Sequence, residues 1–178
     1  MRPDWNQTFL EICAVLSKRS TCRRRKTAAI LVRNRNIISI GYNGVPSGEV
    51  HCEDMGFGDN LHREWSSENE IHGEINALLR CEGSAKGAIM YTVYSPCTQC
   101  AKAIVAAGIS GVHCRFLYHK GDRALKLLEQ AGIPVTSVDA YTYRPSAIRN
   151  DCDDSGAFML AFGVTVVMFV CLNVAHFY

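Results

Sequence analysis

Four side chains in the middle of the sequence have the types and spacing of a catalytic metal centre. His72 and Glu74 form an H-x-E pair, and after a gap of 21 residues Pro96 introduces a C-x-x-C pair, Cys97 and Cys100. One imidazole and two thiolates are the donors of a zinc site that keeps its fourth tetrahedral position open for water. Glu74 is placed to take a proton from that water. We therefore predict that His72, Cys97 and Cys100 bind a catalytic zinc ion and that Glu74 is the acid/base.

Either half of this pattern is weakly informative by itself. A single C-x-x-C is also typical of a redox pair or of half of a structural zinc site, and a lone H-x-E indicates almost nothing. Together and in this order, the two halves resemble the signature of zinc deaminases that act on nucleobases and nucleotides.

Apolar periodicity and capping residues predict the elements that would position these side chains. Ser66 or Ser67 is expected to cap a helix that carries His72 and Glu74 near its N-terminal end. The apolar face of this helix would comprise Ile71, Ile75, Leu78 and Leu79. A second helix, residues 97–107, starts at the C-x-x-C pair, and its N-terminal dipole favours thiolate over thiol.

The remaining pattern predicts a helix-flanked α/β fold with a mixed five-stranded sheet. Further helices are expected at 5–18 and 122–131, and strands at 28–32, 37–42, 90–94, 112–117 and 135–138. The polar residues 33–36 would join the first two strands as a hairpin. The polar stretch that follows residue 48, as far as Ser67, has no predicted regular structure.

The charge balance gives no indication of a nucleic-acid partner, because the formal net charge of the 178 residues is only +2 and charged residues make up 20%. The one dense basic run is Arg-Arg-Arg-Lys at 23–26. It is either a solvated loop or a binding segment for the phosphate of a small nucleotide, with Arg25 and Lys26 as candidate donors. Nine cysteines, several in metal-type spacings, and no visible signal peptide favour a reducing cytoplasm over a disulfide scaffold.

The length favours one catalytic domain, residues 1–140, followed by an extension, residues 141–178. Within the extension, residues 157–175 form a nearly unbroken apolar run. As a helix these 19 residues would just cross a hydrocarbon core of about 30 Å. A membrane anchor, a hydrophobic strand, a subunit contact and a non-native extension all remain open interpretations.

Residues 5–140 resemble the cytidine deaminase-like superfamily, and within it the deoxycytidylate (dCMP) deaminases, especially those of phages. Beyond the zinc pattern, the matching stretches are 41–46 (GYNGVP), 64–70 (EWSSENE), 75–77 (INA), 95–97 (SPC) and 100–104 (CAKAI). The resemblance implies a three-layer α/β/α fold and hydrolysis of dCMP to dUMP and ammonia, which supplies the thymidylate precursor. It implies that water activated by zinc attacks C4, while Glu74 passes protons to N3 and to the leaving amine. A homo-oligomer, a hexamer in this family, and dCTP and dTTP as effectors are further implications.

The resemblance also implies roles for residues outside the catalytic centre. Asn43 matches an asparagine near the sugar and base, although it is also a plausible turn residue. Tyr118 matches a tyrosine on the substrate side, with a simple rim position as the alternative.

A second, structural zinc is implied by the resemblance, with four donors in and around the polar stretch: Cys22, Cys52, His62 and Glu70. A metal here would fix a segment of low apolar content. The alternative is that Cys52 and His62 are ordinary loop residues, and His51 is a candidate substitute ligand.

One position departs from the family pattern. Gly73 stands in H-x-E where alanine or valine is usual, which inside a helix would cost about 1 kcal/mol without removing a catalytic group. The alternative functions are a related zinc deaminase acting on tRNA adenosine or on a free pyrimidine nucleoside, and a catalytically silent zinc module or membrane-tethered binding protein. The lack of a distributed basic face argues against tRNA, and an intact Glu74 argues against a silent module.

Overall fold

A β-hairpin begins the sheet, and its turn explains where the two strands end. β1 (Ala28–Arg33) and β2 (Asn36–Tyr42) pair antiparallel, and only Asn34 and Arg35 connect them. Both connecting residues have positive φ, 51° for Asn34 and 63° for Arg35. This is the conformation of a type I′ turn, whose twist matches that of the flanking strands. The hairpin predicted from the polar residues 33–36 is confirmed.

The other three strands complete a mixed sheet with the order β2-β1-β3-β4-β5. β3 (Ile89–Tyr94) pairs antiparallel with β1, β4 (Gly111–Phe116) runs parallel to β3, and β5 (Val135–Ser137) runs parallel to β4. The computed structural model describes residues 2–56, 58–118 and 122–138.

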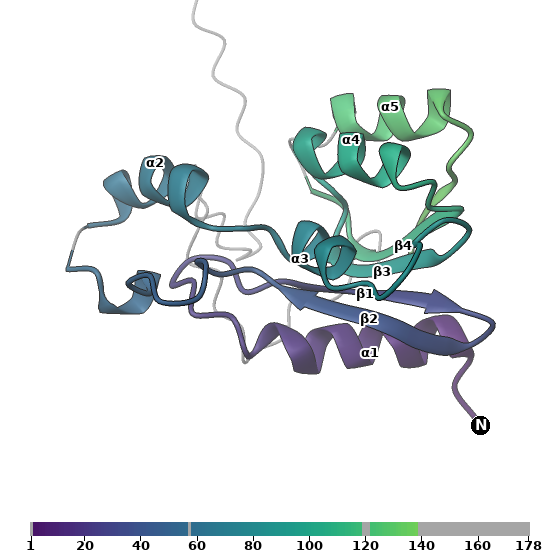
Figure 1. Ribbon diagram of the computed structural model, residues 1–178, viewed down its shortest axis with the longest axis horizontal. Helices are drawn as coiled ribbons and strands as arrows, with labels where there is room; N and C mark the ends of the chain where they lie inside the picture. The colour runs from purple at the N-terminus through teal and green to yellow at the C-terminus, as the bar shows by residue number, and fades with distance from the viewer. Residues whose placement is uncertain (1, 57, 119–121, 139–178) are drawn as a thin grey trace, which may run out of the picture.

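Helices cover both faces of the sheet (Figure 1). α1 (Trp5–Ser17) lies on one face, and α3 (Gly73–Leu79), α4 (Thr98–Ala106) and α5 (Asp122–Gln130) lie on the other. The N-cap residue of α1 is Asp4, whose side chain accepts a hydrogen bond from the Gln7 amide at 2.9 Å. The predicted helix-flanked five-stranded sheet and three-layer arrangement are confirmed.

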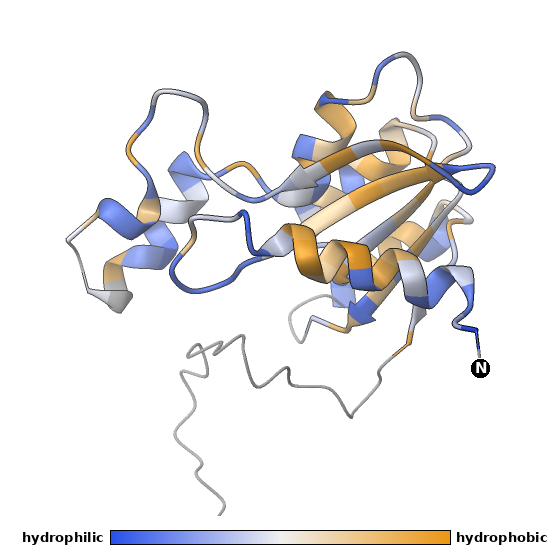
Figure 2. Ribbon diagram, turned by 90° about the horizontal axis from the view of Figure 1, so that it is seen from below, coloured by the Kyte–Doolittle hydropathy of each residue, from blue (hydrophilic) through white to orange (hydrophobic). Residues whose placement is uncertain are grey.

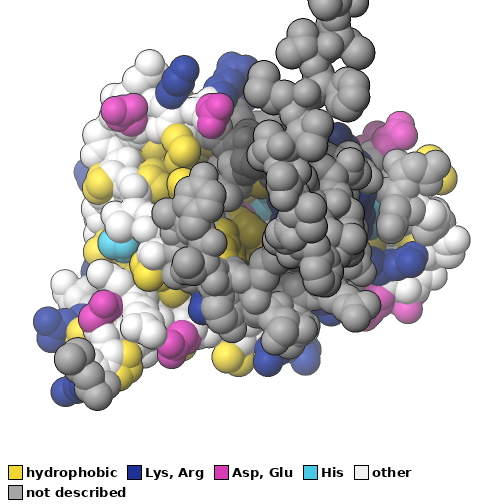
Figure 3. Space-filling view, turned by 180° about the vertical axis from the view of Figure 1, so that it is seen from behind, with side chains coloured by type: hydrophobic (Ala, Val, Ile, Leu, Met, Phe, Trp, Pro, Cys, Tyr) yellow, Lys and Arg dark blue, Asp and Glu magenta, His cyan; other side chains and the backbone are white. Residues whose placement is uncertain are grey.

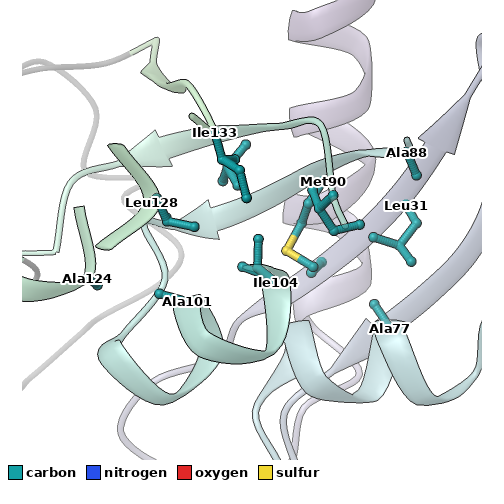
Figure 4. Close-up of a cluster of buried hydrophobic side chains, with 12 residues drawn as sticks. Leu31, Ala77, Ala88, Met90, Ala101, Ile104, Ala124, Leu128 and Ile133 are labelled. Carbon is teal, nitrogen blue, oxygen red and sulfur yellow. The ribbon is translucent and has the colours of Figure 1, made fainter. Parts of the chain in front are cut away.

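The central strands β1 and β3 are almost entirely buried because each of the two helical layers packs on its own core. Toward α3, α4 and α5, the side chains of Leu31, Met90, Ile104 and Leu128 point toward one another (Figure 4). Toward α1, a second cluster comprises Phe9, Leu10, Cys13, Ile30, Val32, Tyr91 and Val93. Alternate residues of β1 thus enter opposite cores, and the strands are among the most hydrophobic parts of the ribbon (Figure 2).

The long connection between β2 and α3 contains helices that the sequence pattern did not predict. A short 3-10 helix, η1 (Cys52–Asp54), is followed by α2 (Asp59–Asn69), which lies to one side of the sheet (Figure 1). α2 is mainly hydrophilic (Figure 2), so its sequence offers little of the periodicity that marks a helix packed on a core. The expectation of an irregular stretch up to Ser67 was therefore wrong.

The predicted start of the motif helix was also wrong. Ser66 and Ser67 lie inside α2, and the Ser67 hydroxyl donates to the Glu64 carbonyl at 2.9 Å. α3 starts only at Gly73, because the backbone of Ile71 pairs with Gly44 through N···O distances of 2.8 and 3.1 Å. These bonds hold Ile71 in an extended bridge, outside the helix on which it was expected.

The predicted apolar face of this helix is corrected at its other end too. Leu79 is 72% exposed and does not face the core, whereas Leu78 packs against it. Leu79 is the last residue of this helix, which is only seven residues long.

Two glycines let α3 approach the hairpin closely. A Cβ on Gly41 would overlap the backbone nitrogen of Ala77 and the carbonyl oxygen of Gly73, and would lie 2.8 Å from the carbonyl carbon of Asn76. A Cβ on Gly73 would lie 3.2 Å from the Cα of Ala28. The departure from the family pattern at Gly73 therefore coincides with tight packing of the first turn of α3 on β1.

Replacing Gly41 with alanine is expected to destabilise the protein by about 1–3 kcal/mol or more, because the methyl group must displace backbone atoms of α3. Urea denaturation followed by circular dichroism measures the change. Gly44→Ala is the matched control, since a Cβ there would meet only the Thr21 hydroxyl at 3.9 Å. The control should change stability by less than about 1 kcal/mol. Equal stabilities of the two variants would contradict this account of the packing.

Two buried thiols outside the metal centres are expected to lower the free energy of unfolding at alkaline pH. Burial raises the pKa of Cys13 to about 12 and that of Cys114 to about 11, from an ordinary value of 9.0. Both thiols are protonated in the folded and unfolded states below about pH 8, so their contribution is fully present there. As pH rises through 9, the unfolded chain ionises first and stability is lost.

We expect the zinc-loaded protein to lose about 1–2 kcal/mol of unfolding free energy per thiol between pH 7.5 and 10.5. Urea titrations at the two pH values measure the loss. A double variant, Cys13→Ala with Cys114→Ala, should be less stable at pH 7.5 but should lose less on going to pH 10.5. An equal loss in the variant would exclude these thiols as the cause.

Acidic and basic side chains are interspersed on the uncovered part of the face drawn in Figure 3. Within the described ranges, no helix has the length and apolar composition that crossing a bilayer requires. The apolar run 157–175 lies outside the described residues, and so does the whole of the predicted extension 141–178 with its boundary at 140. The domain division stays a prediction.

Candidate metal centres and active site

The three predicted catalytic ligands meet where two helices begin. His72 is the N-cap residue of α3, Cys97 is the N-cap residue of α4, and Cys100 lies in the first turn of α4. The Nδ1 atom of His72 lies 3.3 Å from Sγ of Cys100 and 3.4 Å from Sγ of Cys97, and the three donor atoms all lie within 4.8 Å of one another. Zinc–nitrogen and zinc–sulfur bonds at tetrahedral angles place such donors about 3.5–3.8 Å apart. The donor set and spacing therefore fit zinc.

The electrostatics of this cluster also favour metal binding. A hydrogen bond with Cys100 is the main reason that the pKa of Cys97 is lowered to about 3, and His72 lowers it further. The same hydrogen bond, followed by burial, raises the pKa of Cys100. The pKa of His72 is raised to about 9, chiefly by its hydrogen bond with Cys97. The three donors thus share protons that a divalent cation replaces on binding.

Glu74 lies beside these donors in the first turn of α3, and its side chain is only 6% exposed. Burial raises the pKa of its carboxyl group above the ordinary value. A carboxyl group that holds a proton more readily than a surface glutamate suits a residue that must both accept and return protons near neutral pH.

A second cluster joins the four donors predicted from the polar stretch. Cys22, Cys52, His62 and Glu70 place one donor atom each within 4.8 Å of the others, and Cys22 Sγ lies 3.3 Å from His62 Nε2. Burial raises the pKa of Cys22 to about 12 and also raises those of Cys52 and Glu70. Oε1 of Glu70 is buried without a hydrogen-bond partner. A buried acceptor without a donor is costly, so this cluster fits a cation.

His51 lies outside this cluster. Its side chain is exposed, and Nδ1 is 3.1 Å from the hydroxyl oxygen of Thr21. The substitute ligand set that includes His51 is therefore not the one that the structure forms.

The structure brings two candidate substrate residues together. The guanidinium of Arg25 lies over the ring of Tyr118, 4.7 Å from its centroid, and also over Tyr94 at 5.1 Å. Lys26 follows Arg25 and is half-buried.

Asn43 uses its carboxamide within the protein. Its Oδ1 accepts from the Thr27 amide at 2.9 Å, and its Nδ2 donates to the Arg25 carbonyl at 2.9 Å and to Glu70 Oε2 at 3.4 Å. The side chain is buried, with 5% of its surface exposed. The Asn43 side chain therefore holds the backbone of the segment that carries Arg25 by hydrogen bonds.

Sequence reasoning missed two residues that support this arrangement. Tyr94 ends β3 and lies under Arg25, while the buried hydroxyl of Ser95 accepts a hydrogen bond from the Tyr118 amide at 2.8 Å. Their position at the carboxyl end of a strand with a parallel neighbour was the available signal, because ligands commonly bind there in α/β sheets.

Comparison with known proteins agrees with this geometry. The profile of the family described as "Cytidine and deoxycytidylate deaminase zinc-binding region" matches residues 3–115. The chain belongs to this family. Among relatives of the deaminase, the deoxycytidylate deaminase of Enterobacteria phage T4 is 36% identical over 171 residues, spanning 74% of this chain and 88% of the phage protein. ComE operon protein 2 of Bacillus subtilis is 39% identical over 141 residues, spanning 78% and 73% of the two chains.

A solved structure supports the same assignment for this deaminase. The dCMP deaminase of cyanophage S-TIM5, in complex with dCMP and dUMP, is 29% identical with a TM-score of 0.65, covering 77% of this chain and 98% of the phage chain. A structure from a study of tRNA:A34 deaminases is 20% identical with a TM-score of 0.52, a likeness that concerns the fold alone.

Proposed function

We propose that this deaminase hydrolyses dCMP to dUMP and ammonia and so supplies the thymidylate precursor. The observation that carries the proposal is the three-donor zinc cluster with the buried carboxyl group of Glu74 beside it. Relatives named deoxycytidylate deaminase, from phage T4 to Homo sapiens at 32% identity, support dCMP as the substrate.

The chemistry divides between the metal and one side chain. Zinc, when held by His72, Cys97 and Cys100, lowers the pKa of a water molecule to about 7 and so provides a nucleophile at neutral pH. Glu74 takes a proton from the water and delivers it to N3 of the pyrimidine as the water oxygen bonds to C4. It then takes the second proton, from the new C4 hydroxyl, and passes it to the leaving amine. Water is consumed, the C4–N bond breaks, ammonia leaves, and Glu74 returns to its starting state.

The substrate phosphate is assigned to Arg25 and Lys26, and Tyr118 and Asn43 are assigned to the sugar and base side. The stacking of Arg25 on Tyr118 supports the first assignment, because a guanidinium held in one orientation binds phosphate with two parallel hydrogen bonds. Asn43 would act on the substrate through its backbone or through the Arg25 segment, since its carboxamide is already bonded.

The substrate assignment is tested by measuring ammonia release from dCMP, deoxycytidine, dCTP and a tRNA anticodon stem-loop side by side. We expect turnover to be fastest with dCMP. Turnover confined to deoxycytidine or to the stem-loop would retain the zinc chemistry and overturn the nucleotide assignment.

The assembly and location are part of the same proposal. We assign a homo-oligomer, a hexamer as in the family, with dCTP and dTTP as effectors and the cytoplasm as location. None of the seven cysteines among the described residues forms a disulfide, which agrees with a reducing compartment. Light scattering coupled to size exclusion, with and without each nucleotide, tests the assembly.

A further inference from the structure

The second metal cluster is built around the basic segment 23–26. Cys22 directly precedes this segment in the chain, and the other donors come from η1, α2 and the residue after α2. The Arg23 amide donates to Cys52 Sγ at 3.4 Å, and the Arg25 amide donates to Cys22 Sγ at 3.5 Å. Two of the four donors therefore also hold the backbone that carries the arginines.

A third donor of the cluster reaches the same backbone through Asn43. Glu70 Oε2 accepts a hydrogen bond from Asn43 Nδ2, which also donates to the carbonyl of Arg25. Asn43 Oδ1 accepts a hydrogen bond from the backbone amide of Thr27, two residues after Arg25. Both backbone groups of Arg25 are thus hydrogen-bonded. Its amide donates to the sulfur of Cys22, a member of the cluster, and its carbonyl accepts from Asn43, which is itself bonded to the cluster carboxylate Glu70.

The side chain of Arg25 leads from this anchor to the catalytic centre. Its guanidinium contacts the rings of Tyr94 and Tyr118, and Tyr94 lies three residues before the zinc ligand Cys97. A backbone fixed at both ends and a stacked guanidinium leave little conformational freedom for Arg25. Such preorganisation increases affinity for an anion by reducing the entropy lost on binding.

We propose that the second metal cluster determines the preference for 5′-phosphorylated substrates, by anchoring Arg25 where it meets the phosphate. Cys22, Cys52, Glu70 and Asn43 are then positioning residues for substrate selection, in addition to any contribution to stability. This inference rests on the proposed deamination of dCMP, because it assigns the phosphate to Arg25.

A second route from the cluster to the active site gives different expectations. Glu70 is separated from the catalytic ligand His72 only by Ile71, which is bonded to Gly44. If the cluster acted through these residues, its loss would weaken the catalytic zinc site and affect substrates with and without a phosphate equally.

The test uses Cys52→Ser, which removes a fully buried thiol with little change in volume. We expect zinc content to fall from two ions to one per chain. The affinity for dUMP, measured by titration calorimetry, should fall about 10–100-fold, a range typical of lost support around a site. Affinity for deoxyuridine should stay within about twofold, and the KM for dCMP should rise with little change in kcat.

Two variants complete the experiment. Arg25→Met should show the same loss of dUMP affinity while retaining two zinc ions, and Arg19→Met, an exposed arginine just before the segment, should behave as the wild type. If circular dichroism shows that Cys52→Ser is unfolded, His62→Gln replaces it.

The outcomes separate the proposals. A folded variant with one zinc ion that keeps the wild-type ratio of dUMP to deoxyuridine affinity would overturn the inference. Equal losses for both ligands, together with loss of the catalytic zinc, would also overturn it in favour of the route through His72. A wild-type protein without preference for dUMP would instead refute the proposed function itself.

Discussion

Replacing Glu74 with glutamine should leave zinc bound and lower kcat for dCMP by about 10²–10⁴-fold, the contribution typical of a general acid–base residue. Glutamine preserves the size of the side chain, which is 6% exposed in the first turn of α3, but it cannot carry a proton between water and the pyrimidine. Because the carboxyl group is not one of the three donors, the metal site should remain intact.

Steady-state ammonia release and zinc analysis of the same preparations measure both parts of this expectation. Glu82→Gln is the matched control, since Glu82 is an exposed carboxylate just after α3, and it should retain full activity. Near-normal kcat in Glu74→Gln would exclude Glu74 as the acid/base. Loss of zinc from that variant would show instead that the carboxylate supports the metal.

Replacing Cys100 with serine should remove the catalytic zinc and reduce turnover by at least about 10³-fold, because water then keeps a pKa far above neutrality. Cys100 is fully buried, and its Sγ lies 3.3 Å from Nδ1 of His72. A serine hydroxyl in this position is a poor substitute for a thiolate, which is the softer zinc ligand.

Zinc content and kcat of Cys100→Ser are compared with those of Cys81→Ser. Cys81 is a half-buried free cysteine that lies in neither metal cluster, so its replacement should leave both quantities unchanged. A Cys100→Ser protein that retains its full zinc content and wild-type kcat would contradict the ligand assignment.

The catalytic centre was predictable because its information is local. H-x-E and P-C-x-x-C contain the donor residues themselves. The helix expected at 97–107 agrees with α4 (Thr98–Ala106) to within one residue at each end. Apolar runs likewise marked the strands, since strands covered by helices on both faces are apolar throughout.

What the sequence did not predict depends on contacts between distant segments. The interruption at Ile71 is caused by Gly44, and the placement of Arg25 depends on Tyr94 and Tyr118. α2 is mainly hydrophilic, but it contributes His62 to a metal cluster. The contribution of α2 to a metal site cannot be predicted from the spacing of its apolar residues.

The strand order has a consequence for how the molecule acquires its metals. β3 lies between β1 and β4, so pairing of the early hairpin with the later strands closes a loop of many residues, a slow step in folding. The two clusters differ in where their donors lie in the chain. The second cluster draws all four from residues before β3, whereas the catalytic cluster combines His72, before β3, with Cys97 and Cys100, after it. In a nascent chain the second cluster therefore has all of its donors before β3 is made, whereas the catalytic centre gains its two cysteine ligands only after β3.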